Sequence, residues 1–352
     1  MSRVLFVLTF GFGLLSPFSG LFAQDQQLGS RTKAMGGSYT AFEDDPVSVW
    51  LNPAGIAAQP DQVSVAYQTY VAYPISNDRG PGDTIITSEK TETILVDPVI
   101  IPSYLGAVFQ LGDEETSMAI GACFARPYHL NYAMAKVTDP TLPSFSPDSS
   151  VEQSLSRIRV AFAYDFRLRE GGEEGWLSHV SIGGGVDLGF MRWRYKSTDQ
   201  DTTDTTTSLG CGLGALVGVY DNTKSVRVNF GLAYQSGVKY DFDIAPDILP
   251  AFDMPQQINV GLTFFLLEGT PLRATVDFQW IDWSETAEKP AFAKSFPEFE
   301  DALNFSLGIE YRFSLSESIN LYPRLGYRYF DAPWDNENDL PVTGAYKLVL
   351  DT

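Results

Sequence analysis

The feature of this sequence that most constrains its fold is a strict alternation of large apolar residues with small or polar ones. In residues 158–168, every even position is large and apolar, and the odd positions are Arg, Ala or Asp. The same period of two recurs in residues 226–235, 272–280 and 303–313. It places successive side chains on opposite faces of a β-strand. One face is bulky and the other is rich in Gly and Arg, which predicts an all-β transmembrane antiparallel β-barrel with a polar lumen. A soluble β-sandwich is the alternative.

The connections between these segments alternate in length. Short turns are expected near residues 112–115, 170–175, 221–224, 268–270 and 315–318, and longer polar loops near residues 77–97, 135–150, 197–207, 242–255, 285–301 and 331–342. Short periplasmic turns and longer extracellular loops are typical of transmembrane barrels. About twelve strands are visible, from a first strand near Asp61 to a last one in residues 345–350. Because the chain stops at Thr352 without a terminal aromatic residue, we expect about two further strands; a miscount is the alternative.

The N-terminus predicts export. Residues 1–23 combine a short basic start, an apolar run and a small-residue segment ending at Ala23, as in a cleaved secretory signal peptide. The apolar run is shorter than the roughly 20 residues of a membrane-spanning helix, although an uncleaved anchor is the alternative. With the barrel pattern, this predicts location in the cell outer membrane. The net charge of −20 argues against nucleic acid as a partner.

Few residues suit catalysis, metal binding or cofactor binding. His129 and His179 stand alone, and the sequence has no Gly-x-Ser-x-Gly motif. We therefore expect no enzyme activity, no metal site and no cofactor. Cys123 and Cys211 fall in strands that are not expected to be neighbours, so both are interpreted as free thiols.

Two predicted strands contain irregularities. In residues 178–196, the apolar phase changes near Phe190 and Met191, which predicts a β-bulge. Pro127 interrupts the strand expected over residues 117–132, and proline is tolerated there only at an edge or a bulge. A lateral opening in the barrel wall and a simple bend near the membrane surface are both consistent with Pro127.

Residues 24–60 do not alternate and predict a compact plug inside the barrel, followed by the barrel itself in residues 61–352. The plug carries three short motifs, formed by Met35, Gly36 and Gly37, by Asp44 and Asp45, and by Asn52, Pro53, Ala54 and Gly55. The order and spacing of these motifs resemble the N-terminal hatch of the FadL-type family, which takes up long-chain fatty acids and other hydrophobic molecules. Similar patterns follow later, at Met254-Pro255, Asp282-Trp283-Ser284, residues 324–329 and Asp331-Ala332-Pro333.

The resemblance implies a monomeric barrel of fourteen strands whose hatch blocks free diffusion. It further implies that the hatch moves when a hydrophobic ligand binds, and that the ligand leaves sideways into the outer-membrane lipid. This chain is shorter than its relatives, with smaller outer loops. PorV-like proteins of the type IX secretion system share a very similar hatch, so a binding protein that carries secreted proteins is the alternative function. A passive porin is a third, which the hatch argues against.

Candidate ligand-binding residues fall into two groups. A fatty acid needs a cation for its carboxylate, and Arg157 and Arg159 lie on the predicted lumen face. These arginines also fit a structural role as partners of lumen acids or of the hatch, because an unpaired buried charge is costly. The loop over residues 242–255 is unusually apolar for an outer loop. Its candidates for ligand capture are Phe242, Ile244, Ile248, Leu249 and Phe252, although a loop folded over the barrel mouth has the same composition.

Overall fold

The computed structural model describes most of the chain that follows the predicted signal peptide. The described residues are 28–42, 44–67, 102–112, 117–134, 149–169, 174–196, 201–222, 225–242, 252–266, 271–284, 300–316, 319–329 and 347–351. The predicted signal peptide therefore lies outside them, as do Ile244, Ile248 and Leu249.

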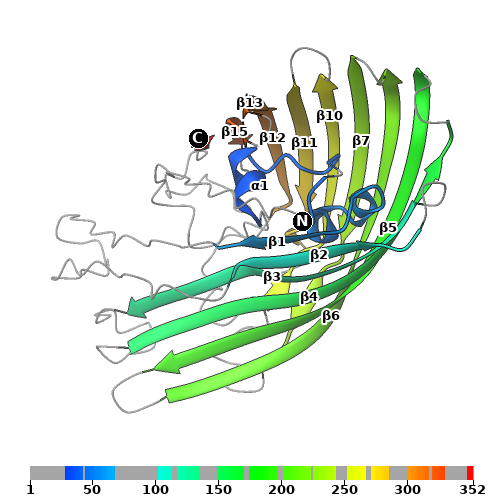
Figure 1. Ribbon diagram of the computed structural model, residues 1–352. Helices are drawn as coiled ribbons and strands as arrows, with labels where there is room; N and C mark the ends of the chain where they lie inside the picture. Colours follow the sequence, from blue (N-terminus) through cyan, green and yellow to red (C-terminus); the bar gives the residue numbers. More distant parts are fainter. Residues whose placement is uncertain are drawn as a thin grey trace.

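One twelve-stranded antiparallel sheet forms the wall of the molecule. Its strands, in spatial order, are β1 (Gln62–Ala66), β2 (Tyr104–Gln110), β3 (Ser117–Met134), β4 (Ser149–Arg167), β5 (Gly175–Lys196), β6 (Asp201–Asn222), β7 (Val226–Gln235), β10 (Gln257–Leu266), β11 (Leu272–Ile281), β12 (Ala302–Tyr311), β15 (Arg324–Tyr329) and β16 (Lys347–Asp351). Two hairpins stand apart from it, formed by β8 (Val238–Tyr240) with β9 (Phe252–Met254) and by β13 (Phe313–Ser316) with β14 (Ile319–Leu321). Figure 1 shows the sheet curving around the N-terminal helices. The prediction of an all-β antiparallel barrel with about twelve visible strands is confirmed.

The outer face of the sheet is apolar, as the alternation predicts. Phe162, Val186, Leu209 and Phe278 are 48%, 64%, 70% and 49% exposed. An apolar surface of this extent is unfavourable in water and favourable against lipid. Cys123 lies inward and is buried, whereas Cys211 is partly buried, and both thiols are free.

Three short helices lie on the concave side of the sheet (Figure 1). They are α1 (Ser30–Ala34), α2 (Ser48–Leu51) and the 3₁₀ helix η1 (Pro53–Ile56). Trp50 and Ile56 are fully buried and share one apolar core with Tyr104 and Val108 of β2. We call residues 28–60 the hatch. Among the described residues, no helix is both long and apolar enough to cross a membrane.

The strands β3 to β6 are much longer than their neighbours and project beyond them (Figure 1). The expected long loop over residues 197–207 is wrong, because β6 already begins at Asp201. Its first residues are mostly threonines, whose branched Cβ favours strands in spite of the polar hydroxyl. β5 and β6 are each 22 residues long, about twice the 9–11 residues that a strand needs to cross a membrane.

The bulge expected near Phe190 and Met191 is also wrong. The register between β4 and β5 is unbroken from Lys196 to His179. What changes at this point is the chemistry of each face, since Met191 and Trp193 point inward and are buried while Arg192 points outward and is exposed. The change of phase therefore marks the level at which the outward face of β5 changes from apolar to charged residues.

Pro127 occupies a bulge in β3. The register between β3 and β4 shifts between Ala125 and Tyr128, which explains how a long strand accommodates proline. Ala125 pairs with Arg157 and Tyr128 pairs with Leu155 on β4, so the bulge lies at the level of these two inward-facing residues. A lateral opening at this bulge stays a prediction.

Candidate functional site

The Asn-Pro-Ala-Gly motif ties the hatch to the barrel wall. The Asn52 side chain is fully buried. Its Oδ1 accepts a hydrogen bond from the Ala54 backbone N–H at 3.2 Å, which caps η1. Its Nδ2 donates to the carbonyl oxygens of Thr40, at 2.7 Å, and of Ala215 in β6, at 3.2 Å. One amide thus connects two segments of the hatch and the wall.

Glycines allow the hatch and the wall to approach each other closely. A Cβ atom at Gly183 of β5 would lie 2.5 Å from the Ala54 backbone nitrogen. On the opposite side, Gly36 adopts φ 68°, in the left-handed region, and packs against the backbone of Gly326 and Tyr327 in β15. The Gly-rich polar face seen in the sequence is therefore the surface against which the hatch packs.

Asp44 belongs to a charged cluster between the hatch and strands β11, β12 and β15. Arg31 of the hatch binds Asp44 at 3.0 Å and Glu310 at 2.8 Å. Arg273 also pairs with both carboxylates, and Arg324 binds Glu310 at 2.6 Å. Burial opposes the charge of Asp44, but the guanidinium groups of Arg31 and Arg273 overcome it and hold the pKa of this carboxyl below its ordinary value. The cluster fixes the first half of the hatch.

Asp45 has a different role from its neighbour. Its Oδ1 accepts a hydrogen bond from the Val47 backbone N–H at 2.9 Å, before α2. Burial raises the pKa of the Asp45 carboxyl above its ordinary value, although Arg31 partly opposes this. Asp45 therefore stabilises the turn before α2 through this hydrogen bond, but burial of its charge is unfavourable.

Asp277 of β11 is a further hatch anchor. Its carboxylate accepts four hydrogen bonds from the hatch. The donors are Ser38 Oγ at 2.9 Å, Tyr39 N at 2.8 Å, Thr40 N at 2.7 Å and Thr40 Oγ1 at 2.6 Å. Sequence spacing gave no signal for this contact, because 237 residues separate Asp277 from Thr40.

Arg157 and Arg159 lie above the second half of the hatch, and both are almost fully buried. The two guanidinium groups share one carboxylate, that of Asp187 on β5. They also stack over the Trp50 ring, at 5.2 and 4.6 Å from its centroid, and Arg159 Nη1 donates to the Trp50 carbonyl oxygen at 2.6 Å. The structure thus brings both predicted arginines together at the hatch, where two positive charges meet one negative charge.

An apolar cluster adjoins these arginines inside the projecting part of the barrel. We call it the upper cluster; its members are Leu155, Met191, Trp193, Val238, Tyr240, Phe242 and Met254. Each is at most 8% exposed. Arg157 Nη1 lies 3.8 Å from the Met254 sulfur, which joins the charged and apolar parts. In the described part of the chain, neither Arg157 Nε nor the Tyr240 hydroxyl has a hydrogen-bond partner.

The sequence identified only part of this cluster. Phe242 was among the predicted ligand-binding residues, and Phe252 pairs with Tyr240 in the β8–β9 hairpin. The other six members of the upper cluster were not among the predicted ligand-binding residues. For Met191 and Trp193, the signal was the change of phase in β5, which indicates apolar residues turning toward the lumen rather than a bulge.

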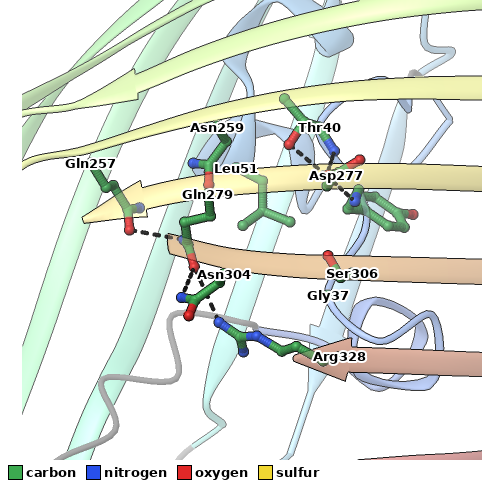
Figure 2. Close-up of a pocket in the computed structure, with 11 residues that line it drawn as sticks. Gly37, Thr40, Leu51, Gln257, Asn259, Asp277, Gln279, Asn304, Ser306 and Arg328 are labelled. Atoms are coloured by element: carbon green, nitrogen blue, oxygen red, sulfur yellow. Dashed lines mark hydrogen bonds between the residues drawn. The ribbon is translucent and has the colours of Figure 1, made fainter. Parts of the chain in front are cut away.

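Figure 2 shows a small polar pocket on the side of the hatch that faces β10, β11, β12 and β15. Its cavity of about 30 Å³ lies between Leu51 of the hatch and strands β10, β11, β12 and β15. Gln279 joins three polar side chains of its wall, binding Gln257 at 3.1 Å, Asn304 at 2.9 Å and Arg328 at 3.1 Å. This volume and lining suit water rather than an apolar ligand.

No protein-family model and no curated protein matches the sequence. Several solved structures match the fold. The toluene transporter TbuX of Ralstonia pickettii has 16% sequence identity and a TM-score of 0.55, over 93% of this chain and 97% of that chain. A FadL homologue from Pseudomonas aeruginosa has 13% identity and a TM-score of 0.52, over 94% and 83%. A ΔS2S3 mutant of the monoaromatic hydrocarbon channel TodX has 14% identity and a TM-score of 0.50, over 91% and 87%. The chain therefore has the FadL-type fold, a transmembrane β-barrel with a hatch on its inner face.

Proposed function

We propose that this protein takes up hydrophobic small molecules across the outer membrane, and that it does so by transport rather than catalysis. The observation that carries the proposal is the upper cluster, an apolar site enclosed by β4, β5 and the β8–β9 hairpin directly above the hatch. The similar folds belong to proteins described as a toluene transporter and a monoaromatic hydrocarbon channel, which supports a hydrophobic cargo.

A fatty acid is the ligand that fits the charges best. Arg157 and Arg159 share the single carboxylate of Asp187, so the cluster carries excess positive charge next to apolar side chains. The unused Arg157 Nε and Tyr240 hydroxyl are two donors for a ligand carboxylate, and the upper cluster is a place for its hydrocarbon chain. A neutral hydrocarbon has no use for these donors.

Three movements complete the proposed path. The β8–β9 hairpin moves away from β4 and β5 to admit the ligand, because the upper cluster is closed in this conformation. Ligand binding disturbs the contact of Arg159 with Trp50, and the hatch shifts. The ligand leaves through the wall at the Pro127 bulge, which lies at the level of Arg157 and Leu155. We infer that the protein functions as a monomer.

Native mass spectrometry of the protein in mild detergent, with lipid extraction, tests the proposal. We expect bound fatty acids or similar molecules in the wild type. The variant Asn52→Ala should lose hatch control, seen as altered ligand retention, whereas Asn320→Ala in the β14 hairpin is the matched control. A lumen without lipid and a secreted protein bound instead would reject uptake and favour the secretion-carrier alternative.

A second measurement separates a fatty acid from other hydrophobic cargo. Binding of a long-chain fatty acid is compared with that of its methyl ester, which keeps the chain and removes the charge. The acid should bind roughly tenfold more tightly, as expected for one charge-assisted hydrogen bond of about 1.5 kcal/mol. Equal affinities would leave hydrophobic uptake intact and reject fatty acid as the specific cargo.

A further inference from the structure

The outer surface of β5 changes from apolar to basic along a single face. Val186 and Leu188 are 64% and 40% exposed on the lipid-facing side. Arg192, Arg194 and Lys196 continue the same face, because alternate residues of a strand share a face. In a chain with net charge −20, three cations in line on one outward face are unusual.

The registered rows of β4, β5 and β6 place this change at the membrane surface. The first row is Ile158, Leu188 and Leu209, which are 45%, 40% and 70% exposed. The second is Ser156, Phe190 and Thr207, and the third is Ser154, Arg192 and Thr205. Hydrocarbon-facing residues thus give way to an aromatic ring between hydroxyls, and then to a cation between hydroxyls.

The spacing of the rows matches the thickness of a headgroup layer. Successive rows are about 7 Å apart along the strand, and the headgroup region of a leaflet is about 5–7 Å thick. Arg192 therefore lies at the level of the headgroups when Leu188 lies in the hydrocarbon. Apart from the short β5–β6 turn over residues 197–200, the connections at this end, over residues 67–103, 135–148 and 282–301, are longer than those at the opposite end, which places it on the outer leaflet.

Arg192 is the cation available to a ligand. Arg194 is held by Asp201 through two hydrogen bonds, of 2.9 and 2.6 Å. Asp201 also attracts Lys196, its cross-strand partner, and Arg192. In the described part of the chain, however, no carboxylate forms a salt bridge or hydrogen bond with Arg192, whose cross-strand neighbours are Ser154 and Thr205. A guanidinium flanked by two hydroxyls suits a phosphate oxyanion.

We propose that Arg192, assisted by Lys196 and the hydroxyls of Ser154 and Thr205, binds the phosphorylated headgroup of an outer-leaflet lipid. The acyl chains of that lipid lie against Ile158, Leu188 and Leu209. The lipid fixes the height of the projecting strands, which also form one wall of the upper cluster. This inference needs the barrel to span the outer membrane, but not any particular cargo.

Native mass spectrometry with added diphosphoryl lipid A tests the proposal on the full chain. Wild type is compared with Arg192→Gln and with Arg169→Gln, which removes a cation from the opposite end of the barrel. The lipid adduct should fall about fivefold in Arg192→Gln, as one basic residue near a charged surface predicts, and should persist in Arg169→Gln. The double variant with Lys196→Gln should lose more.

Three results would overturn the proposal. The first is an unchanged adduct in Arg192→Gln. The second is equal retention of dephosphorylated lipid A by the wild type. The third is complete displacement of the lipid by millimolar inorganic phosphate, which would indicate a site for the free anion. Because Arg192 is exposed and lies outside the lumen, fatty acid binding measured on the same variants should be unchanged, which separates this test from that of uptake.

Discussion

At the scale of residues, the hatch is held both by ion pairs and by close packing of its backbone against glycines of the wall. Gly183 faces the hatch, whereas its neighbour Gly184 faces outward, where a Cβ atom would lie 3.3 Å from a methyl group of Leu213. Two adjacent glycines of one strand therefore serve different purposes, and only the inward one is required by the hatch.

Substitution of these two glycines provides a matched pair. In Gly183→Ala, the new Cβ meets the backbone of Pro53 and Ala54, which cannot move aside as a side chain would. We therefore expect the free energy of unfolding to fall by about 1–3 kcal/mol. Hydrogen exchange across the hatch should speed up in this variant and stay near wild type in Gly184→Ala. Equal exchange in both would mean that the hatch does not need the close approach.

Asp44 and Asp45 should respond oppositely to loss of charge. The pKa of Asp44 is lowered, so its contribution to stability is present above the ordinary value of about 3.9 and is lost as the pH falls through the lower folded value. The pKa of Asp45 is raised, so its charge weakens the hatch at neutral pH, and this cost disappears as the pH falls through the raised value.

At neutral pH, Asp44→Asn should therefore loosen the hatch, because Arg31 and Arg273 lose one of the two carboxylates that they share and keep only Glu310. Asp45→Asn should leave it as tight or tighter, since the amide oxygen still accepts from Val47. Hydrogen exchange of residues 28–60 measured over pH distinguishes the two. A change in the same direction in both variants contradicts the assignment of their roles.

At the scale of elements, the two hairpins outside the sheet are interruptions of an otherwise regular wall. β7 pairs directly with β10, beginning with Gln235 opposite Gln257, so the β8–β9 hairpin is not needed to form the sheet. In the same way, β12 pairs with β15 without the β13–β14 hairpin. The first hairpin covers the upper cluster and the second does not.

Replacing residues 237–255 by a short glycine-rich turn tests this difference. The barrel should still fold, but fatty acid affinity should fall at least tenfold, because Val238, Tyr240, Phe242 and Met254 leave the upper cluster. Shortening residues 312–323 is the control and should leave affinity unchanged. Unaltered affinity in the first variant would remove the upper cluster from the proposed path.

The elements also indicate what the sequence could predict. The alternation identified the strands and their outward faces, because burial on one side leaves a period of two. The first turns of β6 were assigned to a loop because Thr and Asp are polar, although outside the membrane a strand needs no apolar face. Glycine and arginine on the lumen face were visible, but their partners in the hatch lie some 100 to 300 residues away, and no local pattern encodes such pairs.

At the scale of the whole molecule, the hatch serves as the core of the barrel. Its helices contact strands at both ends of the sheet, with Val49, Trp50 and Ile56 packing near β2 and β3, and Gly36 against β15. Arg31 and Glu310 are 279 residues apart in sequence, so we expect these contacts to form late in folding, after most of the wall.

Deletion of residues 28–57 tests whether the barrel wall folds without the hatch. The strands keep their hydrogen bonds, so a folded barrel is expected, but with a lower melting temperature and a larger single-channel conductance. Arg159 and Glu310 would lose their hatch partners. A conductance equal to that of the wild type would show that the hatch does not obstruct the lumen.

Near Phe190, the outward residues of β5 change from apolar to basic and the inward residues become apolar, which limits the insertions that this strand tolerates. Side chains alternate strictly, so insertion of one residue between Phe190 and Met191 would turn Arg192 inward and Trp193 outward, whereas insertion of two would preserve both faces. The two-residue insertion would instead raise the basic residues by about 7 Å. The position of this transition in β5 thus sets one boundary of the lipid-facing surface, and only insertions or deletions of residues in pairs move that boundary without reversing the two faces.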